Sequence, residues 1–159
     1  MRLLMFAILA VALLASDRHL LSQSAGDFKL TDDEALILEL TNAARKEEKV
    51  GPLTVNQTLT KCARLHSANQ AKQMKMAHEL DGKSPADRVK AIGYAYRNMG
   101  ENVAYGEGAV SVQQIFEGWM KSEGHRKNIL KPEFTEIGIG ISIDGRKTYY
   151  TQVFGRPLR

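Results

Sequence analysis

Two histidines and two glutamates lie next to glycines or at expected helix ends, and these four residues are the ones best suited to chemistry. They are His78, Glu101, Glu123 and His125. Imidazole nitrogens and carboxylate oxygens are good zinc ligands, and two histidines with one carboxylate form a common open catalytic set. Their spacing alone does not relate them to one another, so surface or capping residues are the alternative interpretation.

Cys62 and His66 form a second candidate pair. They are four residues apart on an expected helix, so their side chains could touch, as a nucleophilic cysteine–histidine pair requires. Cys62 lies on the apolar half of its helix, where a free cysteine commonly packs as a small hydrophobic residue. We therefore expect Cys62 to pack, although a lone thiol in an exported protein could also form an intermolecular bridge.

Several familiar catalytic motifs are missing from the sequence. It contains no Gly-x-Ser-x-Gly, no P-loop, no His-Glu-x-x-His and no Gly-x-Gly-x-x-Gly pattern. This excludes the ordinary serine hydrolases, nucleotide-binding proteins and zincins.

Helices are expected to position most of these residues. Thr31 and Glu34 form a capping box, and apolar residues follow at helical spacing to about Lys49. A second helix is predicted from about Asn56 to Met76, and its polar second half leads into His78, where it could line a cleft. Two further helices are predicted over residues 84–92 and 110–122.

The C-terminal part of the chain has the pattern of a hairpin. Isoleucines alternate with glycine, serine and aspartate over residues 137–144, which is typical of a half-buried strand. Asp144-Gly145 is a strong turn signal, and residues 148–154 supply the returning strand. Residues 94–109, which contain Glu101, are predicted to form a loop or a short strand. Helices followed by a hairpin indicate an α+β fold.

Length, charge and cysteine content narrow the function classes further. The chain has 159 residues, a net charge of +4 and one cysteine. The length suits one domain, and one cysteine excludes a disulfide framework and any multi-cysteine metal site. Arg126, Lys127 and Lys131 form only a loose basic group with little aromatic interleaving, so we expect no nucleic-acid partner.

The N-terminus has the pattern of an export signal. Arg2 is followed by an unbroken apolar run over residues 3–15. This run is short for a membrane span, which needs about 20 apolar residues. We predict that residues 1–25 are a signal peptide and leader, that no stable transmembrane anchor remains after processing, and that the protein is secreted or lies in the periplasm or cell envelope.

A set of motifs resembles one known family. Ala77-His78, Gly100-Glu101-Asn102-Val103-Ala104, Trp119-x-x-Ser122-x-Gly124-His125-Arg126 and Tyr150-Thr151-Gln152-Val153-Phe154-Gly155 follow one another in the order found in the CAP superfamily. This superfamily, also called the SCP domain, covers cysteine-rich secretory proteins, antigen five and plant pathogenesis-related proteins. The resemblance is to its bacterial branch and covers about residues 31–155.

The resemblance implies a fold and a set of site residues. The fold is an α-β-α sandwich with a small central antiparallel sheet between helical layers, formed by residues 31–159 as a single domain. The site is a cleft with two histidines and two acidic residues, of which His78 and Glu101 match one histidine and the glutamate. The other two positions stay open among Ser122, Glu123, His125 and Tyr149.

The function that we expect is that of an exported binding module at the cell envelope or outside the cell. Its partner would be an extracellular ligand or an envelope component. His78 and His125 would hold zinc or another divalent cation weakly, and Glu101 would orient a water or an imidazole. Two alternatives stay open: a metal-assisted hydrolase of peptides or cell-wall material with Glu101 as general base, and a lipid-binding carrier with an apolar groove.

Overall fold

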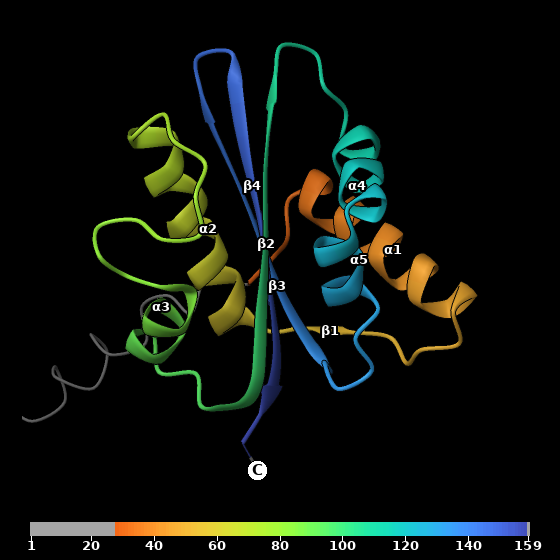
Figure 1. The fold of residues 1–159 in the computed structure, drawn as a ribbon. Helices are drawn as coiled ribbons and strands as arrows, with labels where there is room; N and C mark the ends of the chain where they lie inside the picture. The colour runs from red at the N-terminus through yellow and green to blue at the C-terminus, as the bar shows by residue number, and fades with distance from the viewer. Residues whose placement is uncertain (1–27, 159) are drawn as a thin grey trace, which may run out of the picture.

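A computed structural model describes residues 28–158, so the predicted signal peptide and leader, residues 1–25, lie outside the described residues. A central sheet separates two layers of helices (Figure 1). One face is covered by α2 (Gln57–Lys72) and α3 (Pro85–Ala91). The other is covered by α1 (Asp32–Glu47), α4 (Val112–Lys121) and α5 (Glu123–Ile129). The predicted α-β-α sandwich is therefore confirmed.

The sheet has four strands in the order β1-β3-β4-β2. The long strands β2 (Tyr96–Glu107), β3 (Glu136–Asp144) and β4 (Lys147–Pro157) are antiparallel neighbours. The two-residue β1 (Thr54–Val55) adds a parallel edge beside β3, which makes the sheet mixed. The hairpin predicted around Asp144-Gly145 is the β3–β4 connection.

Two helix ends follow from local chemistry. Thr31 caps α1 in the predicted capping box, with its hydroxyl accepting from the Glu34 amide. The second helix stops at Lys72, one turn before the predicted Met76, because Met74 adopts a left-handed backbone conformation with a φ of 50°. The chain released by this early end forms the loop that carries His78.

The segment around Glu101 is more regular than its sequence indicates. We predicted a loop or a short strand over residues 94–109, whereas β2 extends over twelve residues and pairs with β4 along its whole length. Close packing explains the glycine at position 100, because a Cβ atom there would lie 2.9 Å from the Phe134 ring. Gly100 and Gly106 therefore permit close packing within the strand, whereas Gly108, with a φ of 75°, follows it.

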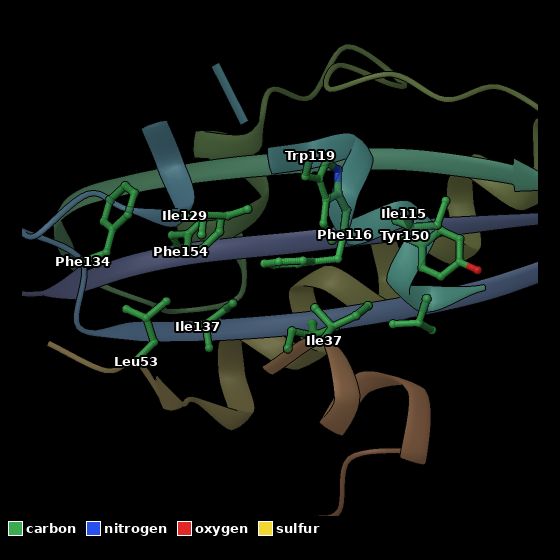
Figure 2. Packing of buried hydrophobic residues seen from close by; sticks show 12 residues of the cluster. Ile37, Leu53, Ile115, Phe116, Trp119, Ile129, Phe134, Ile137, Tyr150 and Phe154 are labelled. Carbon is green, nitrogen blue, oxygen red and sulfur yellow. The ribbon is translucent and has the colours of Figure 1, made fainter. Parts of the chain in front are cut away.

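Two apolar clusters hold the layers together. Figure 2 shows the larger one, in which side chains such as Ile37, Trp119, Ile137 and Phe154 fill the space between the sheet and the layer of α1, α4 and α5. The smaller cluster lies under α2 and α3 and consists of Leu59, Cys62, Ala63, Val89, Tyr94 and Val153. Within residues 28–158, no helix is long and apolar enough to cross a membrane.

Candidate functional site

Glu101 is the centre of the polar cluster. It lies in the middle of β2, opposite Val153 of β4, and only 7% of it is exposed. Its Oε1 atom accepts a hydrogen bond from His78 Nδ1 at 3.0 Å, and its Oε2 atom accepts one from Arg88 Nη2 at 2.6 Å. Both carboxylate oxygens are therefore engaged by cationic or polar groups, which offsets the cost of burying the charge.

Arg88 connects three parts of the site. Besides Glu101, its Nη1 atom donates to the backbone carbonyls of His78 at 2.8 Å and Lys83 at 2.9 Å. Because Arg88 belongs to α3, these bonds tie the loop between α2 and α3 to both α3 and β2. The side chain thus fixes the backbone of His78 as well as the carboxylate that His78 contacts.

The polar half of α2 holds the same loop from the other side. The Ala77 amide donates to Gln70 Oε1 at 3.3 Å, and His66 Nε2 donates to the Ala77 carbonyl at 2.9 Å. We predicted that this polar stripe could line a cleft beside His78. His66 and Gln70 of this stripe are buried and anchor the residue that precedes His78, while His66 and Asn69 also line a cavity between α2 and α3.

His125 is placed by a second network. Asn102 Nδ2 donates to the His125 carbonyl at 3.1 Å, and Asn128 Nδ2 donates to Asn102 Oδ1 at 2.9 Å and to the Glu101 carbonyl at 3.2 Å. Burial lowers the pKa of His125, and interaction with the nearby His78 lowers it further. The Asn102 hydrogen bond places the His125 backbone beside β2, at the residue that follows Glu101.

The other candidate positions do not join this cluster. Ser122 is the half-buried residue between α4 and α5. Glu123 is exposed, and its side chain makes no hydrogen bond or ion pair with the residues that the structure describes. Tyr149 of β4 is buried beside its β2 partner Tyr105, with ring centroids 6.3 Å apart. Tyr105 lies four positions along β2 from Glu101.

Two side chains of the cluster could act as metal ligands. In the described part of the chain, no three or more His, Cys, Asp and Glu side chains are grouped so that they could hold a metal ion. Because Glu101 is occupied by His78 and Arg88, the groups left to bind a ligand are the imidazoles of His78 and His125. His78 has 51% of its side chain exposed and has its Nδ1 atom committed to Glu101, so its Nε2 atom is the one available.

Cys62 packs in the core under α2, as we expected. It is 3% exposed, and burial raises the pKa of its thiol to about 11. The His66 Nδ1 atom has no hydrogen-bond partner among the described residues, so the thiol is not bonded to it. A protonated thiol without a bonded base lacks the activation that a nucleophilic cysteine requires.

Arg88 is the site residue that the sequence did not reveal. It belongs to a short polar helix, where an arginine is ordinarily a solvated surface residue. The one sequence signal for Arg88 is that a buried glutamate needs a positively charged partner. That signal does not say which lysine or arginine of the chain is the partner.

The sandwich, together with a His–Glu pair formed by the loop after α2 and the edge strand β2, defines the class of protein. Residues 38–154 match the sequence model of the cysteine-rich secretory protein family, called CAP. The chain therefore belongs to the CAP family, and the resemblance noted in its sequence is confirmed.

Two relatives from Bacillus subtilis agree with this assignment. The uncharacterized protein YkwD of Bacillus subtilis is 39% identical over 122 residues, which cover 76% of this chain and 46% of YkwD. The uncharacterized membrane protein YlbC of the same strain is 33% identical over 127 residues, covering 78% of this chain and 34% of YlbC. This chain thus spans less than half the length of either relative.

A solved structure confirms the fold of this bacterial group. An extracellular protein from Bacillus anthracis that contains an SCP domain superposes with a TM-score of 0.71 at 27% identity. The match covers 81% of this chain and 45% of that protein.

Proposed function

We propose that this chain is an exported CAP-domain binding module in which His78 and His125 take up zinc or another divalent cation. The observation that carries the proposal is the hydrogen bond from His78 Nδ1 to the buried Glu101. Histidines that ligate metals commonly donate their second ring nitrogen to a carboxylate, which fixes the tautomer and the ring orientation. Glu101 would therefore act as a positioning residue rather than as a ligand.

The chemistry of the donor set fits a weak and exchangeable site. Imidazole nitrogens suit zinc, but a tightly held structural zinc ion has four protein ligands and this site offers two. A divalent ion bound by two histidines would keep coordination positions for water or for a donor group on a partner. Such an ion would let the protein recognise a partner that carries a carboxylate, an imidazole or a similar metal ligand.

Glu101 does not fit the hydrolase alternative as a general base. Both of its carboxylate oxygens are hydrogen-bonded, and the Arg88 guanidinium stabilises the charged form that a base would have to give up. A hydrolytic reaction would need another group as the base. The binding function is therefore the one that this geometry supports best.

Export is supported by the N-terminal pattern and by the B. anthracis relative, which is described as extracellular. The name of YlbC makes membrane attachment the alternative that needs to be tested.

Zinc titration by calorimetry tests the metal site. We expect His78→Ala and His125→Ala each to weaken zinc binding at least about ten-fold, and Glu101→Gln to weaken it about ten- to a hundred-fold. Glu123→Gln is the matched control, because Glu123 is exposed and lies only two residues from His125. Zinc affinity that is unchanged in both histidine variants would exclude the site.

A further inference from the structure

A small basic cavity lies at the end of the sheet where β2 begins and β4 ends, which is the lower end in Figure 1. It has a volume of about 160 Å³ and is lined by Arg97, Thr135, Arg156 and Pro157. Small-molecule sites usually measure about 300–1,000 Å³, so this cavity suits a group of a few atoms. Within residues 28–158, its lining includes neither His78 nor His125, so it is separate from the proposed metal site.

An irregularity in strand pairing brings the two arginines together. Tyr96 of β2 pairs with Pro157 of β4, and Asn98 pairs with Arg156. Arg97 is therefore an extra residue between these two pairs, as in a β-bulge, which sets two residues of one strand against one of the other and re-aims a side chain. The bulge holds Arg97 beside Arg156, and both residues line the same cavity.

The two positive charges have no acidic partner in the protein. In the described part of the chain, the arginines that form ion pairs are Arg64, Arg88 and Arg126. Arg97 and Arg156 are exposed and belong to none of these pairs. Because two like charges that share a small cavity repel each other, an anion from outside would stabilise the arrangement.

The carboxylate that follows Thr135 in the sequence is already used elsewhere. Glu136 Oε2 accepts hydrogen bonds from the Tyr94 hydroxyl at 2.7 Å and from Asn56 Nδ2 at 3.0 Å. Neither Glu136 nor Glu133 lines the cavity, and none of the four lining residues is acidic. The cavity thus keeps its positive charge for a ligand.

A terminal phosphate group matches this set of residues. Guanidinium groups present planar forks of N–H donors that suit carboxylates and phosphates. A terminal phosphate carries about 1.5 to 2 negative charges at pH 7 and has three acceptor oxygens, whereas a carboxylate carries one charge and two oxygens. Two arginines and one threonine supply two positive charges and a hydroxyl. We propose that Arg97, Arg156 and Thr135 bind a terminal phosphate group, either the free ion or the phosphate of a monoester.

Protein-observed NMR with four small probes tests this proposal. Inorganic phosphate, glycerol phosphate, dimethyl phosphate and acetate are titrated at constant ionic strength into isotope-labelled protein, and the amide shifts of residues 96–98, 135, 155 and 156 are followed. The protein is kept free of metal, so the result does not depend on the proposed zinc site. We expect saturable shifts with inorganic phosphate and glycerol phosphate. Their affinities should be at least about five-fold higher than those of dimethyl phosphate and acetate, which carry one charge each.

The four probes separate the possible sources of the phosphate group. Tighter binding of glycerol phosphate than of inorganic phosphate would assign the site to a monoester, and the reverse order would assign it to the free ion. No saturable shift with either of them, or equal affinity for acetate, would overturn the proposal.

Arginine variants supply the matched comparison. Arg97→Gln and Arg156→Gln each remove one charged donor fork and are expected to weaken phosphate binding about five-fold or more. Arg146→Gln makes the same change at an exposed residue of the β3–β4 turn that does not line the cavity, so it should leave binding unchanged. Arg156→Lys keeps the charge without the fork and should bind with intermediate affinity. Equal weakening by Arg146→Gln would show general charge attraction and overturn the proposal.

Discussion

Arg88 supplies the positive charge that the buried Glu101 carboxylate requires. Replacing it by methionine keeps much of the side-chain volume but leaves Glu101 with an unpaired charge. Removing one partner of a buried ion pair commonly costs about 3–5 kcal/mol, and Arg88 is only 12% exposed. We therefore expect Arg88→Met to lower the free energy of unfolding, measured in urea, by about 3 kcal/mol.

Arg97→Met is the control for this substitution, because Arg97 is exposed and has no ion pair among the described residues. Its free energy of unfolding should stay within about 0.5 kcal/mol of the wild type. The double variant Arg88→Met/Glu101→Gln should be less destabilised than the sum of the two single variants, because the neutral amide no longer needs a cation. Additive losses would show that the two side chains do not interact.

His66 makes folding stability sensitive to pH. Burial lowers the pKa of His66 below 6.5, while the same residue in the unfolded chain keeps its ordinary value. Below pH 6.5 the unfolded state therefore binds more protons than the folded state. The free energy of unfolding should fall with decreasing pH in this window, by at most about 1.4 kcal/mol per pH unit for this one group.

Urea unfolding between pH 7.5 and 5.5 in the presence of a chelator measures this effect, with the pH range set by the unfolded pKa of about 6.5. We expect His66→Gln to flatten the pH dependence, since a glutamine does not titrate. A His66→Gln variant with the full wild-type slope would assign the effect to another group.

At the scale of the elements, helices α1 to α4 and the hairpin could be predicted because their signals are local, whereas α5 and β1 were not predicted. Capping boxes begin α1 and α3, and alternating isoleucines define β3. The length of β2 and the early end of α2 could not be predicted in this way. Strand β2 depends on pairing with β4, fifty residues away in the chain, and the end of α2 depends on the left-handed turn at Met74.

The candidate site divides in the same manner. His78, Glu101 and His125 could be named because short motifs resemble those of a family. Arg88 and the anchoring of Ala77 by Gln70 and His66 depend on contacts between separate elements, which no local pattern encodes. The resemblance thus indicated the candidate site residues, whereas the groups that hold them in place required the structure.

The close contact between α2 and β3 depends on the glycines of β3. A Cβ atom at Gly138 would lie 2.0 Å from the Leu59 carbonyl carbon, which belongs to the backbone of α2 and cannot rotate away. Gly138→Ala must therefore push α2 off the sheet, and we expect a loss of about 3 kcal/mol or more in the free energy of unfolding. Thermal and urea unfolding measure this loss.

Gly118→Ala is the matched control, since Gly118 lies in α4 and a Cβ atom there would meet no atom within 4 Å. Alanine favours helix over glycine by up to about 1 kcal/mol, so this variant should be slightly more stable than the wild type. If Gly138→Ala were equally stable, α2 would not pack as closely against β3 as described.

At the scale of the whole molecule, polar side chains cross the interior and join its layers. Gln152 on β4 donates to Thr41 of α1 and accepts from Asn102 of β2, while on the α2 side Ser67 donates to Thr151. These bonds satisfy buried groups on both faces of one strand, and the sequence has a single cysteine, so no intrachain disulfide contributes. Packing and hydrogen bonding therefore carry the stability of this domain.

The division between the N-terminal segment and this fold leads to a prediction about export. Helix α1 begins at Asp32, so removal of residues 1–25 would leave every described element intact. Leu9→Asp interrupts the apolar run over residues 3–15 and should keep the full-length protein inside the cell, because a signal peptide needs an unbroken apolar core. Cell fractionation and intact mass of the wild type and the variant measure the outcome.

Leu158→Asp is the control for this last substitution, since Leu158 is 60% exposed at the other end of the chain and should not affect export. We expect the wild type and Leu158→Asp outside the cytoplasm with the N-terminal segment removed. Wild-type protein that keeps its full mass in the membrane fraction would show that residues 3–15 anchor the chain. In that case the CAP domain would act at the membrane surface, where its His78–His125 pair could meet only partners within reach of the linker before α1.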